Sequence, residues 1–188
     1  MHKFKTITTS SEGVYKEKGS TFIGFAFPIL DEETFKVNLS EIKKLHPDAV
    51  HHCYAFRLNP TGNVYRYSDD GEPANTGGKP IYGQLLSFEV TNIAVVVVRY
   101  YGGTKLGVGG LITAYKEAAK EALLTAEIIE KEITTSIMVS FPYEQTAVIN
   151  QLIHHQKLNI VSQSFDEKCH FMLEFSLHKK EEIISLLI

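Results

Sequence analysis

The sequence predicts an α+β protein with two domains, and three observations support this. Segments rich in β-branched and aromatic residues alternate with segments of helical periodicity along the chain. All 13 glycines lie before residue 111, so the second part of the chain has different backbone needs. The net charge of −3 arises entirely after residue 129. We therefore expect domains over residues 1–129 and 133–188, with the joint within residues 127–132.

Strands and one capped helix are expected in the first half of the N-terminal domain. Residues 21–29 are rich in Phe and predict a strand that closes at Pro28. Asp31 is a candidate N-cap for a helix that ends before Pro47. The apolar positions of this helix recur every three or four residues: Phe35, Leu39, Ile42 and Leu45. Residues 53–58 and 64–67 predict a hairpin around the turn 59–63.

A polar loop, a short helix and a buried strand are expected next. The loop covers residues 68–79, and residues 79–87 form the short helix. Residues 93–99 are a continuous β-branched run, which predicts a strand buried on both faces. After a glycine-rich loop, a longer helix places small and apolar residues on one stripe: Leu111, Tyr115, Ala118, Ala122 and Ala126.

The C-terminal domain has a simpler pattern. Residues 133–141 alternate as a strand does, Pro142 opens a helix, and residues 158–165 form a second strand. In the next strand the side chains expected to point inward are Phe171, Leu173, Phe175 and Leu177. A second helix begins near Glu181, so the order is β-α-β-β-α, a ferredoxin-like unit without its fourth strand. Because that strand would begin at Ile188, we expect a shortened domain.

Composition excludes several classes of protein. Hydrophobic residues make up 44% and charged residues 22%, which is typical of globular proteins and not of disordered ones. Cys53 and Cys169 are too few for a disulfide framework or a zinc quartet, so free thiols and a cytoplasmic protein are expected. The N-terminus lacks the apolar core of a signal peptide, and the apolar run 93–98 is too short to span a bilayer. We therefore expect no membrane contact.

The segment over residues 99–111 (RYYGGTKLGVGGL) is the most informative candidate site. It joins the buried strand to the long helix, where free N–H groups and the positive end of the helix dipole suit a phosphate. It is neither a Walker A loop nor a complete dinucleotide fingerprint. The glycines could instead only permit tight packing of strand on helix, and both readings stay open. The candidate anion- or nucleic-acid-binding residues are Arg99, Tyr100, Tyr101, Gly102, Gly103, Lys105, Gly107, Gly109 and Gly110, together with Lys79.

The polar loop carries a second candidate site. Asp69, Asp70 and Glu72 are close enough to bind a hard cation or to act as acid and base. The spacing does not fit an EF-hand, and a turn with Asx hydrogen bonds explains the residues equally well. Residues 51–53 (HHC) lack the further soft ligands that zinc needs, so they are expected to be ordinary strand residues. We expect no metal, no cofactor and no catalytic residue.

Two long motifs resemble the IMPACT/YigZ family. They are residues 67–80 (YSDDGEPANTGGKP) and 96–115 (VVVRYYGGTKLGVGGLITAY), and residues 18–23 and 51–56 are also similar to its pattern. The resemblance implies an N-terminal domain like the second domain of ribosomal protein five of the small subunit, a fold shared with domain four of elongation factor G. It implies a C-terminal domain like domain five of that factor. Eukaryotic relatives act as translational regulators that compete for an activator of a stress kinase. They carry a different extra domain that we do not expect in this chain, so that partner is not expected to carry over.

Three functions follow as hypotheses. In the first, a non-catalytic protein binds RNA or the ribosome, with phosphate held by the glycine-rich loop and bases stacked on Tyr100 and Tyr101. The basic residues that could assist are Arg99, Lys105, Lys79, Arg57 and Arg66. In the second, an enzyme acts on a phosphorylated small molecule through the acidic loop. In the third, the chain is a protein-binding regulator of translation or the stress response. We expect the loops 69–80 and 100–110 to lie side by side.

Overall fold

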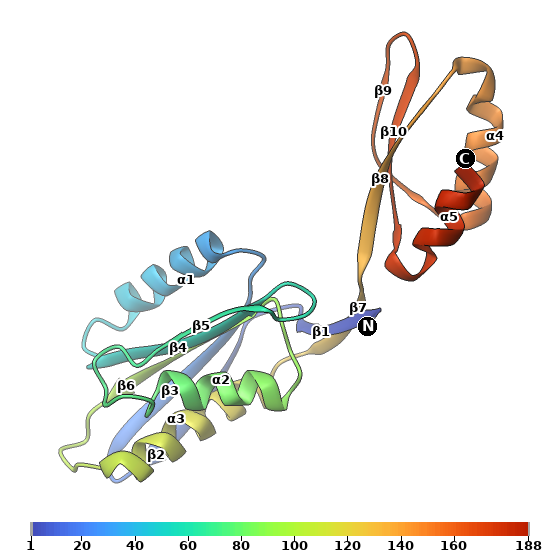
Figure 1. Ribbon diagram of the computed structural model, residues 1–188. Helices are drawn as coiled ribbons and strands as arrows, with labels where there is room; N and C mark the ends of the chain where they lie inside the picture. The colour runs from blue at the N-terminus through green and yellow to red at the C-terminus, as the bar shows by residue number, and fades with distance from the viewer. Residues whose placement is uncertain (1, 188) are drawn as a thin grey trace. The chain divides into compact units, whose positions relative to one another are not determined.

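The computed structural model describes residues 2–187, which form two compact units (Figure 1). The larger unit comprises residues 4–131. The smaller unit comprises residues 132–187 together with His2 and Lys3 at the N-terminus. Each unit has a hydrophobic core of its own, so each is described by itself. Within residues 2–187, no helix is both long and apolar enough to cross a membrane.

The larger unit is built on an antiparallel five-stranded sheet. In spatial order its strands are β2 (Ser11–Glu17), β3 (Ser20–Pro28), β6 (Ile93–Tyr100), β4 (His51–Leu58) and β5 (Val64–Ser68). Helix α1 (Glu32–Leu45) covers one face, and α2 (Gly78–Ser87) and α3 (Gly107–Leu124) cover the other (Figure 1). The sheet is therefore the middle layer of three.

The central strand β6 confirms the prediction of a strand buried on both faces. Val95 and Val97 pack toward α2 and α3, whereas Val96 and Val98 pack toward α1. All four side chains are fully buried, which is why the strand reads as a continuous apolar run instead of alternating. The predicted hairpin, the helix capped by Asp31 and the short helix before Ser87 are also confirmed.

Three strands were not expected from the sequence. They are β2 and two short strands, β1 (Lys3–Ile7) and β7 (Ile128–Glu132), which pair with each other. Most of the predicted joint over residues 127–132 is therefore a strand. Short polar strands carry little periodicity of their own. The pairing of β1 with β7 leaves no local signal either, because the two strands lie more than 100 residues apart, whereas β2 pairs with the adjacent β3.

The smaller unit confirms the predicted order β-α-β-β-α. Its elements are β8 (Thr134–Phe141), the 3₁₀ turn η1 (Tyr143–Gln145), α4 (Thr146–Gln156), β9 (Asn159–Phe165), β10 (Cys169–Ser176), the 3₁₀ turn η2 (Leu177–Lys179) and α5 (Lys180–Leu187). The sheet order is β8-β10-β9, antiparallel throughout. Phe171, Leu173 and Phe175 are buried as predicted, but Leu177 is exposed because the strand ends at Ser176.

Candidate functional site

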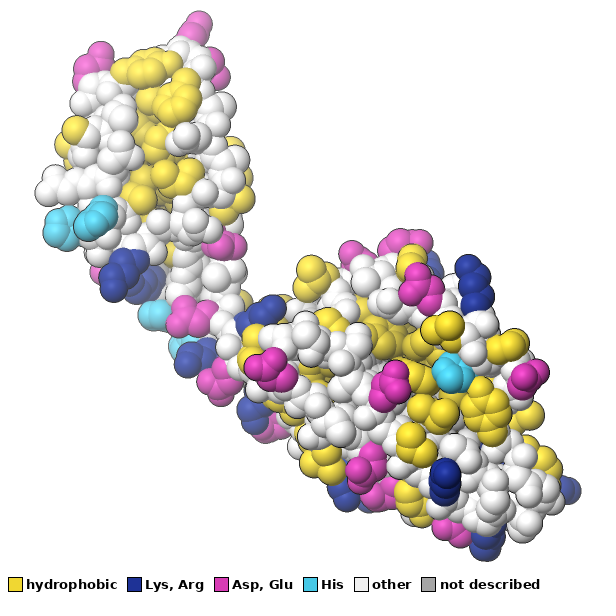
Figure 2. Space-filling model, turned by 180° about the vertical axis from the view of Figure 1, so that it is seen from behind, with side chains coloured by type: hydrophobic (Ala, Val, Ile, Leu, Met, Phe, Trp, Pro, Cys, Tyr) yellow, Lys and Arg dark blue, Asp and Glu magenta, His cyan; other side chains and the backbone are white. Residues whose placement is uncertain are grey.

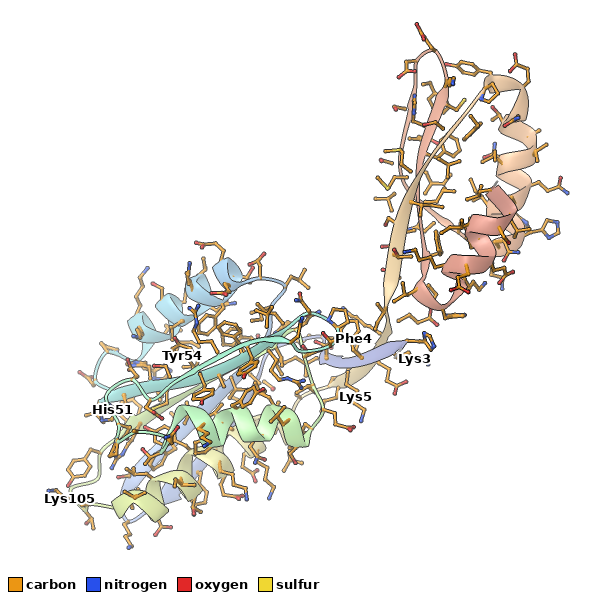
Figure 3. The ribbon with its side chains drawn as sticks, viewed as in Figure 1. Lys3, Phe4, Lys5, His51, Tyr54 and Lys105 are labelled. Atoms are coloured by element: carbon orange, nitrogen blue, oxygen red, sulfur yellow. The ribbon has the colours of Figure 1, made fainter. Side chains whose placement is uncertain are left out.

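The two sequence motifs meet at one end of the larger unit. Strands β4 and β6 are antiparallel neighbours, and their register places His51 opposite Arg99. The start of β4 therefore lies beside the end of β6, from which the glycine-rich loop departs. Figure 3 shows His51 and Lys105 at this same end of the unit. The predicted proximity of the two loops is confirmed, because both contribute walls to one pocket.

This pocket has a volume of about 550 Å³, within the range of small-molecule sites. The acidic loop contributes Glu72 and Pro73, and the glycine-rich loop contributes Tyr101 and Lys105. The remaining lining residues are Val50, His51, Arg99, Leu106, Gly107, Val108 and Leu111. Most of the wall is apolar, with a few polar groups that converge on one side.

Glu72 is the centre of a buried polar cluster. Its Oε1 atom lies 2.6 Å from Arg99 Nη1 and accepts a hydrogen bond of 2.8 Å from the Tyr115 hydroxyl. The side chains of Glu72 and Arg99 are 3% and 8% exposed, so the pair is shielded from water. A buried guanidinium needs such a carboxylate partner. Arg99 is thus ion-paired with Glu72 within the protein, whereas the sequence suggested a side chain that is available to bind phosphate.

Two further groups near this cluster are held in their neutral forms. Burial raises the pKa of the Tyr115 phenol far above its ordinary value, so the hydroxyl remains a donor to Glu72. Burial likewise raises the pKa of the Cys53 thiol, whose Sγ donates to the carbonyl of Asp69 at 3.0 Å. A protonated, buried thiol is a poor nucleophile and a poor metal ligand. Cys53 is therefore a structural contact beneath the acidic loop, and Cys169 is buried in the smaller unit.

Asp69 and Asp70 are engaged by the backbone. Asp69 accepts hydrogen bonds from the N–H groups of Asn75, Gly77 and Gly78, and so caps the start of α2 from eight or nine residues upstream. Asp70 accepts a hydrogen bond of 2.7 Å from the N–H of His52. The reading of this loop as a turn with Asx hydrogen bonds fits this geometry better than the acid–base reading. Within residues 2–187, no group of three or more His, Cys, Asp or Glu side chains is arranged to hold a metal ion.

The glycines before α3 have different surroundings. Gly102 packs so closely on Gly19 that a Cβ atom at this position would overlap the Gly19 backbone. Gly103 and Gly107 have φ angles of +86° and +72°, which favour glycine. A Cβ atom at Gly109 would meet nothing within 4 Å, and its φ angle is ordinary. Packing therefore explains Gly102 but not Gly109.

The start of α3 lies open beside the pocket. Its N-cap position is Leu106, which supplies no side-chain hydrogen bond to the first turn. Lys105 precedes it and is exposed. Tyr101 is 48% exposed, with its ring centroid 5.5 Å from the Arg99 guanidinium carbon. This end of the unit thus combines a helix start without a side-chain cap, the exposed Lys105 and the exposed ring of Tyr101.

Other predicted site residues lie away from the pocket. The Tyr100 hydroxyl hydrogen-bonds His46 Nδ1 at 2.7 Å, and its ring packs with the α1 side of the sheet. Lys79 is exposed on α2 and does not line the pocket. Arg57 donates to the carbonyl of Val90, and Arg66 is paired with Glu32.

Comparison with known proteins identifies the family. Residues 18–123 match the Impact N-terminal domain. An IMPACT family member of Haemophilus influenzae is 36% identical over 177 residues, which cover 92% of this chain and 83% of the relative. The IMPACT family member YigZ of Escherichia coli is 35% identical over 150 residues, covering 79% and 74%. The chain belongs to the IMPACT family. This confirms the resemblance seen in the two motifs.

A solved structure shares the fold of this IMPACT family chain. The crystal structure of a hypothetical protein is 31% identical, with a TM-score of 0.78, over 98% of this chain and 91% of that one. The matched Impact N-terminal domain includes every residue that lines the pocket. The pocket is therefore a feature of the part of the chain that defines the family.

Sequence reasoning missed His51 and Tyr115 as site residues of this IMPACT family chain. His51 was expected to be an ordinary strand residue, and Tyr115 a core residue of a helix stripe. Their roles depend on the β4–β6 register and on α3 packing over the sheet, which place both next to Glu72. A polar hydroxyl within an otherwise apolar helix stripe was the one available signal, because a buried hydroxyl requires a partner.

Proposed function

We propose that this chain is a non-catalytic, regulator-like protein of translation that binds RNA, on its own or within the ribosome, through the pocket of the larger unit. The observation that carries the proposal is the convergence of both family motifs around one pocket at an uncapped helix start. An RNA phosphate fits the first turn of α3, where backbone N–H groups and the exposed Lys105 are available.

Gly109 supports a ligand at this helix start. Glycine in a helix is about 1 kcal/mol less favourable than alanine, so an unneeded glycine weakens α3. Neither packing nor a positive φ angle accounts for Gly109. A ligand that approaches the backbone closely would account for it, because a Cβ atom would then obstruct the contact.

The acidic loop supports binding rather than acid–base catalysis. Both oxygens of Asp69 accept backbone hydrogen bonds, and Glu72 is neutralised by Arg99. The enzyme hypothesis relied on these carboxylates as acid, base or magnesium ligand, so it has less support. The implied resemblance to ribosomal protein five and to elongation factor G supports a role at the ribosome.

Charge distribution favours a local site over a broad basic surface. Acidic and basic side chains are interspersed over the visible face of the larger unit (Figure 2). The chain as a whole carries a net charge of −3. Binding should therefore involve few phosphates and show a shallow dependence on salt concentration.

The test measures single-stranded RNA binding by fluorescence anisotropy between 50 and 200 mM salt. Lys105→Ala should weaken binding to all sequences and reduce the slope of log K against log salt by about 1. Gly109→Ala should weaken binding while leaving α3 as stable or up to about 1 kcal/mol more stable. Lys116→Ala and Gly83→Ala are matched controls, since Lys116 is exposed on the same helix and Gly83 has open space on α2. Unchanged affinity in both pocket variants would contradict the proposal.

Protein binding is a second candidate, favoured by the surface of the smaller unit. Hydrophobic side chains gather on its visible face in Figure 2. Its exposed apolar residues include Met138, Val161 and Phe165, between 55% and 58% exposed. If the chain co-sediments with ribosomes after Lys105→Ala but not after Phe165→Ser, the smaller unit makes the decisive contact.

A further inference from the structure

The polar side of the pocket contains a carboxylate oxygen that can accept a hydrogen bond from a ligand. Glu72 Oε1 accepts hydrogen bonds from both the Arg99 guanidinium and the Tyr115 hydroxyl. The second oxygen, Oε2, lies 3.8 Å from His51 Nε2. That separation is too long for a direct hydrogen bond. Glu72 lines the pocket, so its second oxygen is available to accept a hydrogen bond from a ligand there.

His51 presents a second acceptor at the same place. Its Nδ1 atom lies 2.8 Å from the carbonyl oxygen of Asp70. A carbonyl oxygen only accepts, so Nδ1 carries a proton, and when the ring is neutral Nε2 has a free lone pair. In that form of the ring, two acceptors face each other across 3.8 Å. A group with N–H or O–H donors between them would satisfy both.

The charges around the pocket favour a ligand whose hydrogen-bond donor is neutral. Its charged lining residues are Arg99, Lys105 and Glu72. Because Arg99 already neutralises Glu72, Lys105 leaves the lining with a positive excess. A cationic donor, such as a lysine or arginine side chain of a partner, would be repelled. A neutral amino group on a molecule that also carries an anion fits both features.

We propose that the pocket binds one nucleotide of a single-stranded RNA and favours a base with an exocyclic amino group. The amino group of adenine, cytosine or guanine bridges Glu72 Oε2 and His51 Nε2. The base lies against the Tyr101 ring and the apolar wall, and a phosphate reaches Lys105 and the start of α3. Uracil fits poorly, because its N3–H group is flanked by two carbonyl oxygens that oppose the acceptors. This inference rests on the proposed function and specifies the ligand of the same site.

The experiment uses labelled uridine octamers, either unmodified or with a single adenosine or cytidine at a central position. A single substitution avoids the self-stacking of longer adenosine runs. We expect the single adenosine or cytidine to raise affinity about tenfold, as a well-placed base contact does. His51→Leu should reduce this preference below about threefold, whereas Lys105→Ala should weaken all the octamers equally. His178→Leu in the smaller unit is the matched control, since its side chain is exposed.

The outcomes separate this inference from the proposed function. Equal binding of all octamers, still dependent on Lys105, would overturn the base preference and leave phosphate binding in place. Failure of every octamer to bind would contradict both proposals. If His51→Leu does not fold, Tyr101→Ala replaces it, because Tyr101 is half-exposed and its loss should remove the preference by removing the stacking surface. Binding of an arginine-containing peptide instead of RNA would overturn the inference in favour of a protein partner.

Discussion

At Asp69, a single carboxylate organises the acidic loop. It accepts hydrogen bonds from the backbone N–H groups of Asn75, Gly77 and Gly78, with N···O distances of 2.8 to 3.0 Å. Two of these groups belong to the start of α2, whose N-cap residue Gly77 has no side chain to cap it. The neighbouring Asp70 and Glu72 have other partners, so three similar acidic residues have three different roles.

Replacement of Asp69 should therefore destabilise the larger unit. Asp69→Ala leaves three N–H groups without their acceptor, and we expect a loss of about 2 kcal/mol in the free energy of unfolding. Urea denaturation measures this loss. Asp48→Ala is the matched control, because Asp48 is exposed. This variant should change the free energy of unfolding by no more than about 0.5 kcal/mol. Equal midpoints for the two variants would show that the cap contributes nothing.

Among the elements, α1 shows a helix start that the sequence specifies locally. Asp31 Oδ1 accepts a hydrogen bond of 2.7 Å from the N–H of Thr34, and Glu32 and Glu33 fill the first turn. This backbone hydrogen bond lowers the pKa of Asp31 below its ordinary value of 3.8. The ionised carboxylate thus stabilises the folded state more than its protonated form does.

This capping interaction predicts a pH dependence. Since the folded pKa is depressed, the contribution of the charge is fully present above the unfolded pKa of 3.8 and is lost as pH falls through the folded pKa. Asp31→Asn keeps a capping side chain but removes the titration. The difference in urea midpoint between the wild type and this variant should be larger at pH 6 than at pH 3. A difference that does not change with pH would contradict the assignment.

The packing of β3 against α3 depends on the absence of a side chain at Gly24. A Cβ atom there would lie 2.6 Å from the backbone carbonyl oxygen of Ala118. Because backbone atoms cannot rotate away, Gly24→Ala must separate strand and helix, and we expect a destabilisation of about 1–3 kcal/mol. Gly83→Ala, where the added methyl group meets open space, is the control and should not destabilise. A circular dichroism melt of both variants tests this.

At the scale of the whole molecule, two cores of different construction share one chain. The larger unit encloses a sheet between helices on both faces. The smaller unit packs one face of a three-stranded sheet against α4 and α5. Since the two cores share no buried residue, we expect the units to unfold separately.

Core truncations should confirm this independence. Leu173 and Leu85 are both fully buried, the first in the smaller unit and the second in the larger. Leu173→Ala should destabilise the smaller unit by about 2–5 kcal/mol and accelerate amide exchange in β8–β10 while β6 remains protected. Leu85→Ala should give the opposite pattern. Exchange that accelerates throughout the chain in either variant would show a single cooperative unit.

The sequence alone determined the elements whose information is local. The alternation of Phe171, Leu173 and Phe175, the buried run of β6 and the cap at Asp31 each depend on neighbouring residues, so periodicity and capping rules find them. The family motifs likewise identified both loops of the pocket. Only the tertiary structure decided the pairing of β1 with β7 and the partners of Asp69, Glu72 and Arg99. These depend on groups far apart in the chain, where burial removes most of the surrounding water and leaves other protein groups as the main donors and acceptors.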